Sequence, residues 1–348
     1  MARPEQPTLF DVARKAGVST ATISRALNEP GKIAWATLER IETAIEELGY
    51  VPNFGGRLLA SSRVDIVGAI IPTMANAMFA SGLQAFQEVM AEAGVTMLVA
   101  TTGYDAENEM HHIRRLISHG AGGLLLIGNE RPAATRDFLM MRAVPYVVTW
   151  CFEDDPNQQF VGFNNHEAAK QATEHVLAEG HRRIAMISGR SARNDRARNR
   201  IAGVRAAIRS HGHGAELIQI YEADYLLAAG GTGLMEIMSA PEPPTAIICG
   251  NDVLAAGAIC EARARGVKVP DDVSIIGFDD IGLAAVTVPA MSTVRVPQID
   301  MGRQAAQALL RRIREGGPAD SIELATRFVR RQSLGPPPHP QPPRPAKD

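Results

Sequence analysis

The chain has 348 residues, of which 45% are hydrophobic and 5% aromatic, and its formal net charge is −2. This length allows two or three domains with aliphatic cores, and the near-neutral charge excludes binding to nucleic acid through overall positive charge. The three cysteines are far apart, so we expect no disulfide framework, metal site or cofactor, and a reducing cytoplasm fits. No apolar signal segment or membrane span is present, so neither export nor a membrane partner is expected.

Residues 8–50 predict a domain of three short helices. Thr8 caps TLFDVARKA, which ends at Gly17, and Ser19 caps STATISRAL. The third helix, WATLERIETAIEELG, has apolar residues at helical spacing and ends at Gly49. Two helices joined by a short glycine turn are typical of a helix-turn-helix DNA-binding domain.

The second helix of such a domain places its N-terminal residues in the major groove. Thr20, Ala21 and Thr22 form that first turn, and the forked guanidinium of Arg25 suits guanine. Ser19 and Thr22 suit phosphate oxygens, which position the helix without reading sequence. The expected DNA-binding residues of this helix are Ser19, Thr20, Ala21, Thr22, Arg25 and Asn28.

A three-helix module that binds protein is the alternative, and the charge distribution favours DNA. Residues 14–32 carry a net charge of +3, whereas the acidic residues gather on the third helix. A locally basic face with an acidic back suits contact with phosphates.

From residue 64 onward, apolar strand-like segments alternate with helical ones. This alternation predicts parallel sheets with helices on both faces, and the length predicts two α/β subdomains. The last residues, 335–348, contain seven of the 22 prolines. We expect this tail to be disordered.

The motifs TLFDVARKAGVSTATISRALN and ELGYVPN resemble the start of LacI/GalR-family repressors, and EGHRRIAMISG, NDVLAAGA and GVKVPDDVSIIGFDD continue the resemblance. It covers residues 8–332. The resemblance implies a helix-turn-helix domain and a periplasmic-binding-protein-like core of two Rossmann-like subdomains. It implies three crossings, which we place near residues 163, 294 and 320. The first subdomain would hold 64–162 and 295–319, and the second 163–294 and 320–332.

The same resemblance makes residues 51–63 a hinge helix that folds on DNA. Leu59 matches the family's leucine that enters the minor groove, where an apolar wedge kinks the duplex. Gly55 and Gly56 oppose helix formation, since each costs about 1 kcal/mol relative to alanine. A plain flexible linker is therefore the alternative.

Ligands of binding-protein folds lie between the subdomains, at the carboxyl ends of the strands. By resemblance, Arg200 is the effector arginine of an R-x-x-G motif, Asn251 and Asp279 bind sugar hydroxyls, and Tyr225 stacks on the ligand. Core packing is the alternative for Trp150, and Met78 and Phe79 could instead simply start the next helix. The full candidate set is Met78, Phe79, Trp150, Arg196, Arg198, Arg200, Tyr225, Asn251 and Asp279.

The segments NAMF, TTGYD, VVTW and VGFNN resemble the gluconate-operon branch of the family. A sugar acid would place its carboxylate on Arg200, assisted by Arg196 or Arg198. A purine or a phosphosugar is the alternative effector. No G-K-[ST] or G-x-S-x-G motif occurs, so we expect a DNA-binding regulator and not an enzyme; a sugar-acting enzyme and a solute-binding protein are the competing classes.

We expect a homodimer on a palindromic operator, because one recognition helix reads only a few base pairs. The segments 79–94 and 252–266 carry small and aliphatic residues that suit packing between subunits. No apolar heptad repeat follows residue 332, so a tetramer is not expected.

Overall fold

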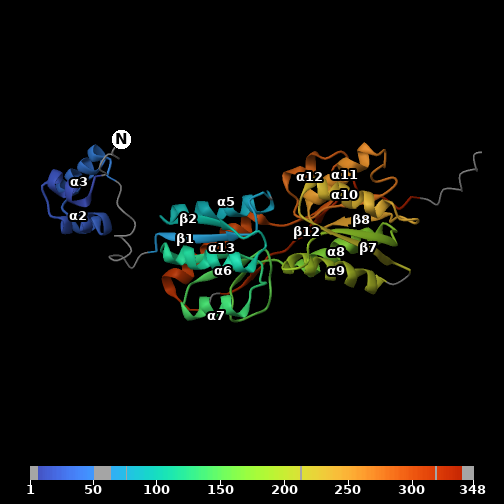
Figure 1. Ribbon diagram of the computed structural model, residues 1–348, viewed down its shortest axis with the longest axis horizontal. Helices are drawn as coiled ribbons and strands as arrows, with labels where there is room; N and C mark the ends of the chain where they lie inside the picture. The colour runs from blue at the N-terminus through green and yellow to red at the C-terminus, as the bar shows by residue number, and fades with distance from the viewer. Residues whose placement is uncertain (1–6, 51–63, 76, 212–213, 318–319, 339–348) are drawn as a thin grey trace, which may run out of the picture. The chain divides into compact units, whose positions relative to one another are not determined.

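The computed structural model describes residues 7–50, 64–75, 77–211, 214–317 and 320–338, and the chain divides into two compact units. One unit extends to Val64 and the other begins at Asp65. Figure 1 shows the helices of the first unit and the two α/β lobes of the second. No helix among the described residues is long and apolar enough to cross a membrane.

The first unit contains α1 (Leu9–Ala16), α2 (Thr20–Asn28), a 3₁₀ turn (Pro30–Lys32) and α3 (Trp35–Leu48). Thr8 and Asp11 form a capping box at the start of α1, and Gly17 ends it at φ +66°, a conformation that glycine adopts without strain. The three helices share one core, to which each contributes buried aliphatic residues: Val12, Ala13, Ala16, Ile23, Ala26, Ile41 and Ala44. The predicted three-helix domain is therefore confirmed.

A six-stranded sheet with the order β11-β5-β4-β3-β1-β2 forms the first lobe of the second unit, and its pairings are parallel. The strands are β1 (Ile66–Ile71), β2 (Thr96–Thr101), β3 (Ala121–Ile127), β4 (Tyr146–Thr149), β5 (Phe160–Gly162) and β11 (Ile322–Glu323). The helices are α5 (Ala77–Glu92), α6 (Ala106–Ser118), α7 (Ala133–Met141) and α13 (Gln298–Glu315). Ile66 and Ile70 of β1 pack in one core with Ile113 of α6 and Leu139 of α7, whereas α5 and α13 pack together and contact β2 to β5.

The second lobe has a parallel sheet of order β7-β6-β8-β9. The strands are β6 (Arg183–Gly189), β7 (Glu216–Ala223), β8 (Ala246–Cys249) and β9 (Ser274–Ile276). The helices are α8 (Asn165–Ala178), α9 (Asp195–His211), α10 (Leu227–Met238), α11 (Asp252–Ala264) and α12 (Gly282–Val286). Together, the lobes confirm the expected pair of α/β subdomains.

Small residues of α5 and α11 let helices of the same chain approach closely, and our expectation that these segments also pack between subunits stays a prediction. A Cβ at Gly257 of α11 would stand 1.9 Å from the carbonyl oxygen of Leu227 in α10, and one at Gly302 of α13 would stand 2.0 Å from that of Gly82 in α5. These glycines serve packing within the chain and give no support for a subunit interface.

Two short strands lie where the chain passes between the lobes. They are β10 (Thr293–Arg295) and β12 (Arg327–Val329), and they pair antiparallel. We expected residues 320–332 to belong to the second lobe, but Ile322 and Glu323 form β11 and pair with β5 of the first sheet. This pairing satisfies backbone groups at the edge of that sheet, so the third crossing follows β11.

The start of the expected disordered tail is also ordered. Gly335 is buried, its carbonyl oxygen lies 2.8 Å from His181 Nε2, and its N–H donates to Ser274 Oγ at 3.1 Å. Buried backbone groups require such partners, and His181 and Ser274 supply them. Residues 339–348 lie outside the described part of the chain.

Candidate functional site

Helix α2 of the first unit exposes the side chains that were assigned to DNA. Ser19, Thr20, Ala21 and Arg25 are exposed and Thr22 is partly exposed, whereas Ile23 is fully buried. The apolar side of the helix thus holds it in the core, and the opposite side is open to a partner.

Ser19 has the predicted capping role, and its hydroxyl and that of Thr22 are the ones that we expected to contact phosphate. Ser19 Oγ accepts from the N–H of Thr22 at 3.2 Å, and the two hydroxyls are hydrogen-bonded at 2.9 Å. Ser19 therefore caps α2, as a serine at this position typically does. A DNA phosphate that contacts these hydroxyls would have to share them with the hydrogen bonds that cap α2.

Most of the basic residues in the expected basic face are paired within the domain. Arg14 contacts Asp11 at 2.7 Å, Lys15 contacts Glu47 at 2.6 Å, and Lys32 contacts Glu29 at 3.0 Å. Exposed pairs of this kind contribute about 0–1 kcal/mol, so phosphates can replace the carboxylates. Among the described residues, Arg25 makes no ion pair. The side chain of Asn28 and all of Leu59, Gly55 and Gly56 lie outside the described part of the chain.

In the second unit, Arg200 of α9 is almost wholly buried among residues of the second lobe. Its Nε donates to Asn165 Oδ1 at 2.8 Å, and its Nη1 donates to the carbonyl oxygen of Gly250. The guanidinium lies 3.9 Å from the ring centre of Phe278, a cation–π arrangement. These contacts fix the orientation of the guanidinium. Arg200 Nη2, however, has no hydrogen-bond partner among the described residues.

Asp279 and Asn251 complete a group of buried polar atoms around Arg200. Asp279 Oδ1 lies 3.8 Å from Arg200 Nη2, and burial raises the pKa of Asp279 to about 7 although Arg200 opposes the rise. Asn251 Oδ1 caps α11 by accepting from Leu254 N–H at 2.9 Å. Within the described part of the chain, Asp279 Oδ1 and Asn251 Nδ2 have no hydrogen-bond partner. Such atoms carry a desolvation cost that a bound polar ligand can relieve.

Two tyrosines stand beside this group, one of which was expected. The rings of Tyr225 and Tyr104 are 6.3 Å apart. Burial is the chief cause that raises the pKa of Tyr104, and Arg196 and Arg200 oppose this rise. Tyr104 has a φ of +63°, an unusual conformation for a tyrosine that is typical of functional sites. It belongs to the predicted TTGYD segment but was not singled out.

Trp150, Phe79 and Met78 pack in the interior. Trp150 is fully buried, and its ring meets that of Phe79 edge to face at 5.3 Å. Met78 is also buried. The tryptophan also touches the α5 backbone, since a Cβ at Gly82 would stand 2.6 Å from its ring. These contacts fit the core-packing alternative, although Trp150 Nε1 lacks a hydrogen-bond partner in the described structure.

Arg196 and Arg198 are engaged by carboxylates. Arg196 Nη1 donates to Asp195 Oδ1 at 2.7 Å, and Asp195 Oδ2 accepts from the N–H of Asn129 in the other lobe at 2.7 Å. Arg198 is half-exposed and pairs with Glu130, also in the other lobe, at 2.7 Å. These contacts connect the lobes, and they leave Arg198 at the rim of the cleft.

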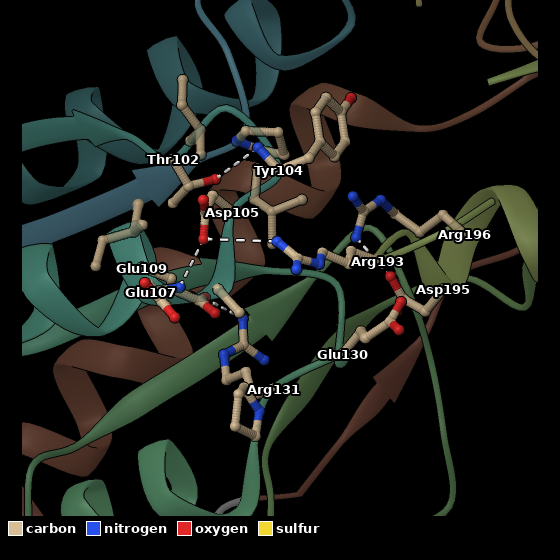
Figure 2. Close-up of a pocket in the computed structure, with 16 residues that line it drawn as sticks. Thr102, Tyr104, Asp105, Glu107, Glu109, Glu130, Arg131, Arg193, Asp195 and Arg196 are labelled. Atoms are coloured by element: carbon tan, nitrogen blue, oxygen red, sulfur yellow. Dashed lines mark hydrogen bonds and ion pairs between the residues drawn. The ribbon is translucent and has the colours of Figure 1, made fainter. Parts of the chain in front are cut away.

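A cavity of about 450 Å³ opens between the lobes at the carboxyl ends of β1, β2 and β3. Figure 2 shows Thr102, Tyr104, Asp105, Glu109 and Arg131 on the first-lobe side, facing Arg193, Asp195 and Arg196. Of the candidate effector residues, only Arg196 lines it. Glu109 and Arg131 were missed, since they lie in segments with no recognisable motif; their position after β2 and β3 was the available signal.

Comparison with known proteins extends this picture. Residues 8–53 match the model for bacterial regulatory proteins of the lacI family, and residues 173–334 match the periplasmic binding protein-like domain. The HTH-type transcriptional regulator GntR of Pseudomonas aeruginosa is 33% identical over 94% of this chain and 96% of that protein. The chain belongs to the LacI family of transcriptional regulators.

Two solved structures agree with this assignment. A LacI-family regulator from Silicibacter pomeroyi has a TM-score of 0.87 at 27% identity, over 94% of this chain and 99% of that one. The regulator CelR, solved as a cellobiose complex, has a TM-score of 0.68 at 29% identity, over 94% and 99% of the two chains. The related proteins are DNA-binding regulators and not enzymes, so the sugar-acting enzyme is excluded from the competing classes.

Proposed function

We propose that this LacI-family regulator binds a palindromic operator and that a small sugar-like effector in the cleft controls its affinity for DNA. The observation that carries the effector assignment is a group of three buried polar atoms that lack a hydrogen-bond partner in the described structure: Arg200 Nη2, Asn251 Nδ2 and Asp279 Oδ1. The only contact between these described atoms is the 3.8 Å ion pair of Arg200 with Asp279. Two donors and one acceptor suit a polyhydroxylated ligand, because each hydroxyl can both donate and accept. The exposed side of α2 supports the DNA assignment.

A sugar acid such as gluconate is our candidate effector. Its carboxylate would accept from Arg200 Nη2 and Asn251 Nδ2, and charge-assisted hydrogen bonds of this kind are the stronger ones. Asp279 would be protonated beside it, which agrees with its pKa of about 7. The likeness of several short segments to the gluconate-operon branch supports the same class.

Control of DNA binding would act through the contacts that join the lobes. Glu130–Arg198 and Asn129–Asp195 already connect them, and a ligand held by both lobes would favour this closed arrangement. A ligand shifts an equilibrium only by its difference in affinity for the two states. The proposal therefore requires that open and closed forms bind the operator differently.

We also propose that the functional form is a dimer, because a palindromic operator requires two recognition helices. The exposed residues Leu226, Leu227, Val286 and Val288 offer apolar surface for such contact. Light scattering is expected to give twice the chain mass; a monomer or a tetramer would contradict this part of the proposal.

Thermal unfolding against a panel of ligands tests the effector class. A ligand at 100 times its dissociation constant stabilises a protein by about 2.7 kcal/mol, so gluconate and related acids should raise the melting temperature. Stabilisation only by purines, by phosphosugars or by neutral sugars would reject the sugar acid and retain the regulator.

A further inference from the structure

Glu109 and Arg131 form a buried pair on the first-lobe side of the cavity. Arg131 is 5% exposed and Glu109 is 9% exposed. Arg131 follows β3, and Glu109 lies in the first turn of α6. The first turn of a helix favours an acidic residue, because the helix dipole is positive there.

Arg131 is held rigidly while one edge of its guanidinium stays available. Its Nη1 donates to the carbonyl oxygen of Gly128 at 2.7 Å, and its Nη2 lies 3.0 Å from Glu109 Oε1 as an ion pair. Nevertheless, Nε and Nη2 have no aligned hydrogen-bond acceptor within the described residues. A buried polar group in this state calls for an explanation, and the adjacent cavity suggests a ligand.

The charge of the cavity restricts that ligand. Five carboxylates line the cavity, against three arginines: Asp105, Glu107, Glu109, Glu130 and Asp195 against Arg131, Arg193 and Arg196. A ligand carboxylate at Arg131 would face Glu109 at close range, and like charges repel strongly in a buried site. A hydroxyl avoids this conflict, since it accepts from the guanidinium and donates to the carboxylate.

We infer that Glu109 and Arg131 bind the hydroxyl end of the effector and reject ligands that carry a negative charge at that end. This inference rests on the proposed function, and it adds an orientation. The acid group of the effector lies toward Arg200 and Asn251, and its terminal hydroxyls lie toward Arg131.

Gluconate and glucarate test this orientation, because they differ only by a second carboxylate at the hydroxyl end. By calorimetry, the full-length protein should bind glucarate at least about tenfold more weakly than gluconate. Glu109→Gln removes the repelling charge with little change of shape and should reduce that ratio about tenfold. Glu109→Gln/Arg131→Gln should weaken gluconate binding about tenfold, through loss of a charged donor.

Arg142→Gln is the matched control, since Arg142 lies near the ring of Phe138 in the same lobe and does not line the cavity. Arg142→Gln should change the affinity neither for gluconate nor for glucarate. The melting temperature of each variant shows whether it folds, independently of its ligand affinity. An unchanged ratio in Glu109→Gln, or equal binding of both acids by the unaltered protein, would overturn the orientation alone. An unaltered protein that binds neither acid would reject the sugar-acid proposal together with this inference.

Discussion

The polar groups assigned to DNA lie on the outside of α2, whereas most of those assigned to the effector are buried in the second unit. Arg25 is exposed, but Arg200 is 1% exposed and held by Asn165, Gly250 and Phe278. Substitution of an exposed residue changes recognition with little effect on folding. In the cleft, we propose that the same side chains support both recognition and stability, so the two effects must be measured separately.

Arg200→Ala should have the largest effect. It removes the donor that we assign to the effector carboxylate and the hydrogen bonds to Asn165 and Gly250, and leaving a buried polar group without its partner costs about 1–3 kcal/mol. Urea unfolding should show this loss, and calorimetry should show at least a hundredfold weaker gluconate binding. Arg265→Ala is the control, since its exposed pair with Glu261 lies outside the site and such a pair contributes about 0–1 kcal/mol. Equal effects of both substitutions would remove the distinction between the surface and the interior.

Asp279→Asn should change how stability depends on pH. The pKa of Asp279 rises from 3.8 in the unfolded chain to about 7 in the fold, so its favourable contribution is complete below pH 4 and is lost as pH rises to about 7. Relative to the unaltered protein, Asp279→Asn should therefore gain stability by a few kcal/mol across this range. Asp300→Asn, at an exposed position outside the site, is the control variant. Parallel curves for all three proteins would show that Asp279 does not titrate as described.

Arg25→Ala should relax the choice of one base pair in each half-site and cost about 1–3 kcal/mol per contact. Folding stability should stay within about 0.5 kcal/mol, because the residue is exposed. Binding to every single-base variant of the operator gives the readout, with Arg14→Ala in α1 as the control. A uniform loss on all sequences would make Arg25 a phosphate contact.

Gly128→Ala should have the smallest effect. Gly128 has a φ of +73°, and a Cβ there would stand 1.6 Å from Arg196 Nη1 and 2.6 Å from Asp195 Oδ1 of the opposite lobe. Arg196 would have to move, and gluconate affinity should fall about three- to tenfold, or about 0.6–1.4 kcal/mol. Gly94→Ala is the control: it places a side chain at a similar φ of +75°, but the space around its Cβ is open. If both variants bind gluconate equally well, the approach of the lobes at Gly128 does not contribute to binding.

The two regions also differ in how far the sequence predicts them. In the helical domain, Thr8, Gly17 and Ser19 mark helix ends within a few residues, so local chemistry is sufficient to define the three helices. What the sequence did not reveal was pairing between distant residues, such as Lys15 with Glu47.

The cleft depends on such distant pairing throughout. Arg200 was predicted through its R-x-x-G motif, but its partner Asn165 and the pair of Glu109 with Arg131 come from separate strands and helices. Small residues show the same limit. Gly257 and Gly82 indicated close helix packing, but the sequence did not show which helices of this chain they meet.

Operator affinity with and without effector tests the central claim most directly. An operator can be selected from random-sequence DNA by the full chain, and fluorescence anisotropy can then follow its binding as gluconate is added. The proposal predicts at least a tenfold change in operator affinity for the unaltered protein, within the usual range of coupling free energies of about 1–3 kcal/mol. Arg200→Ala should abolish this change while still binding the operator. Operator affinity that stays constant while calorimetry shows gluconate bound in the cleft would contradict the claim.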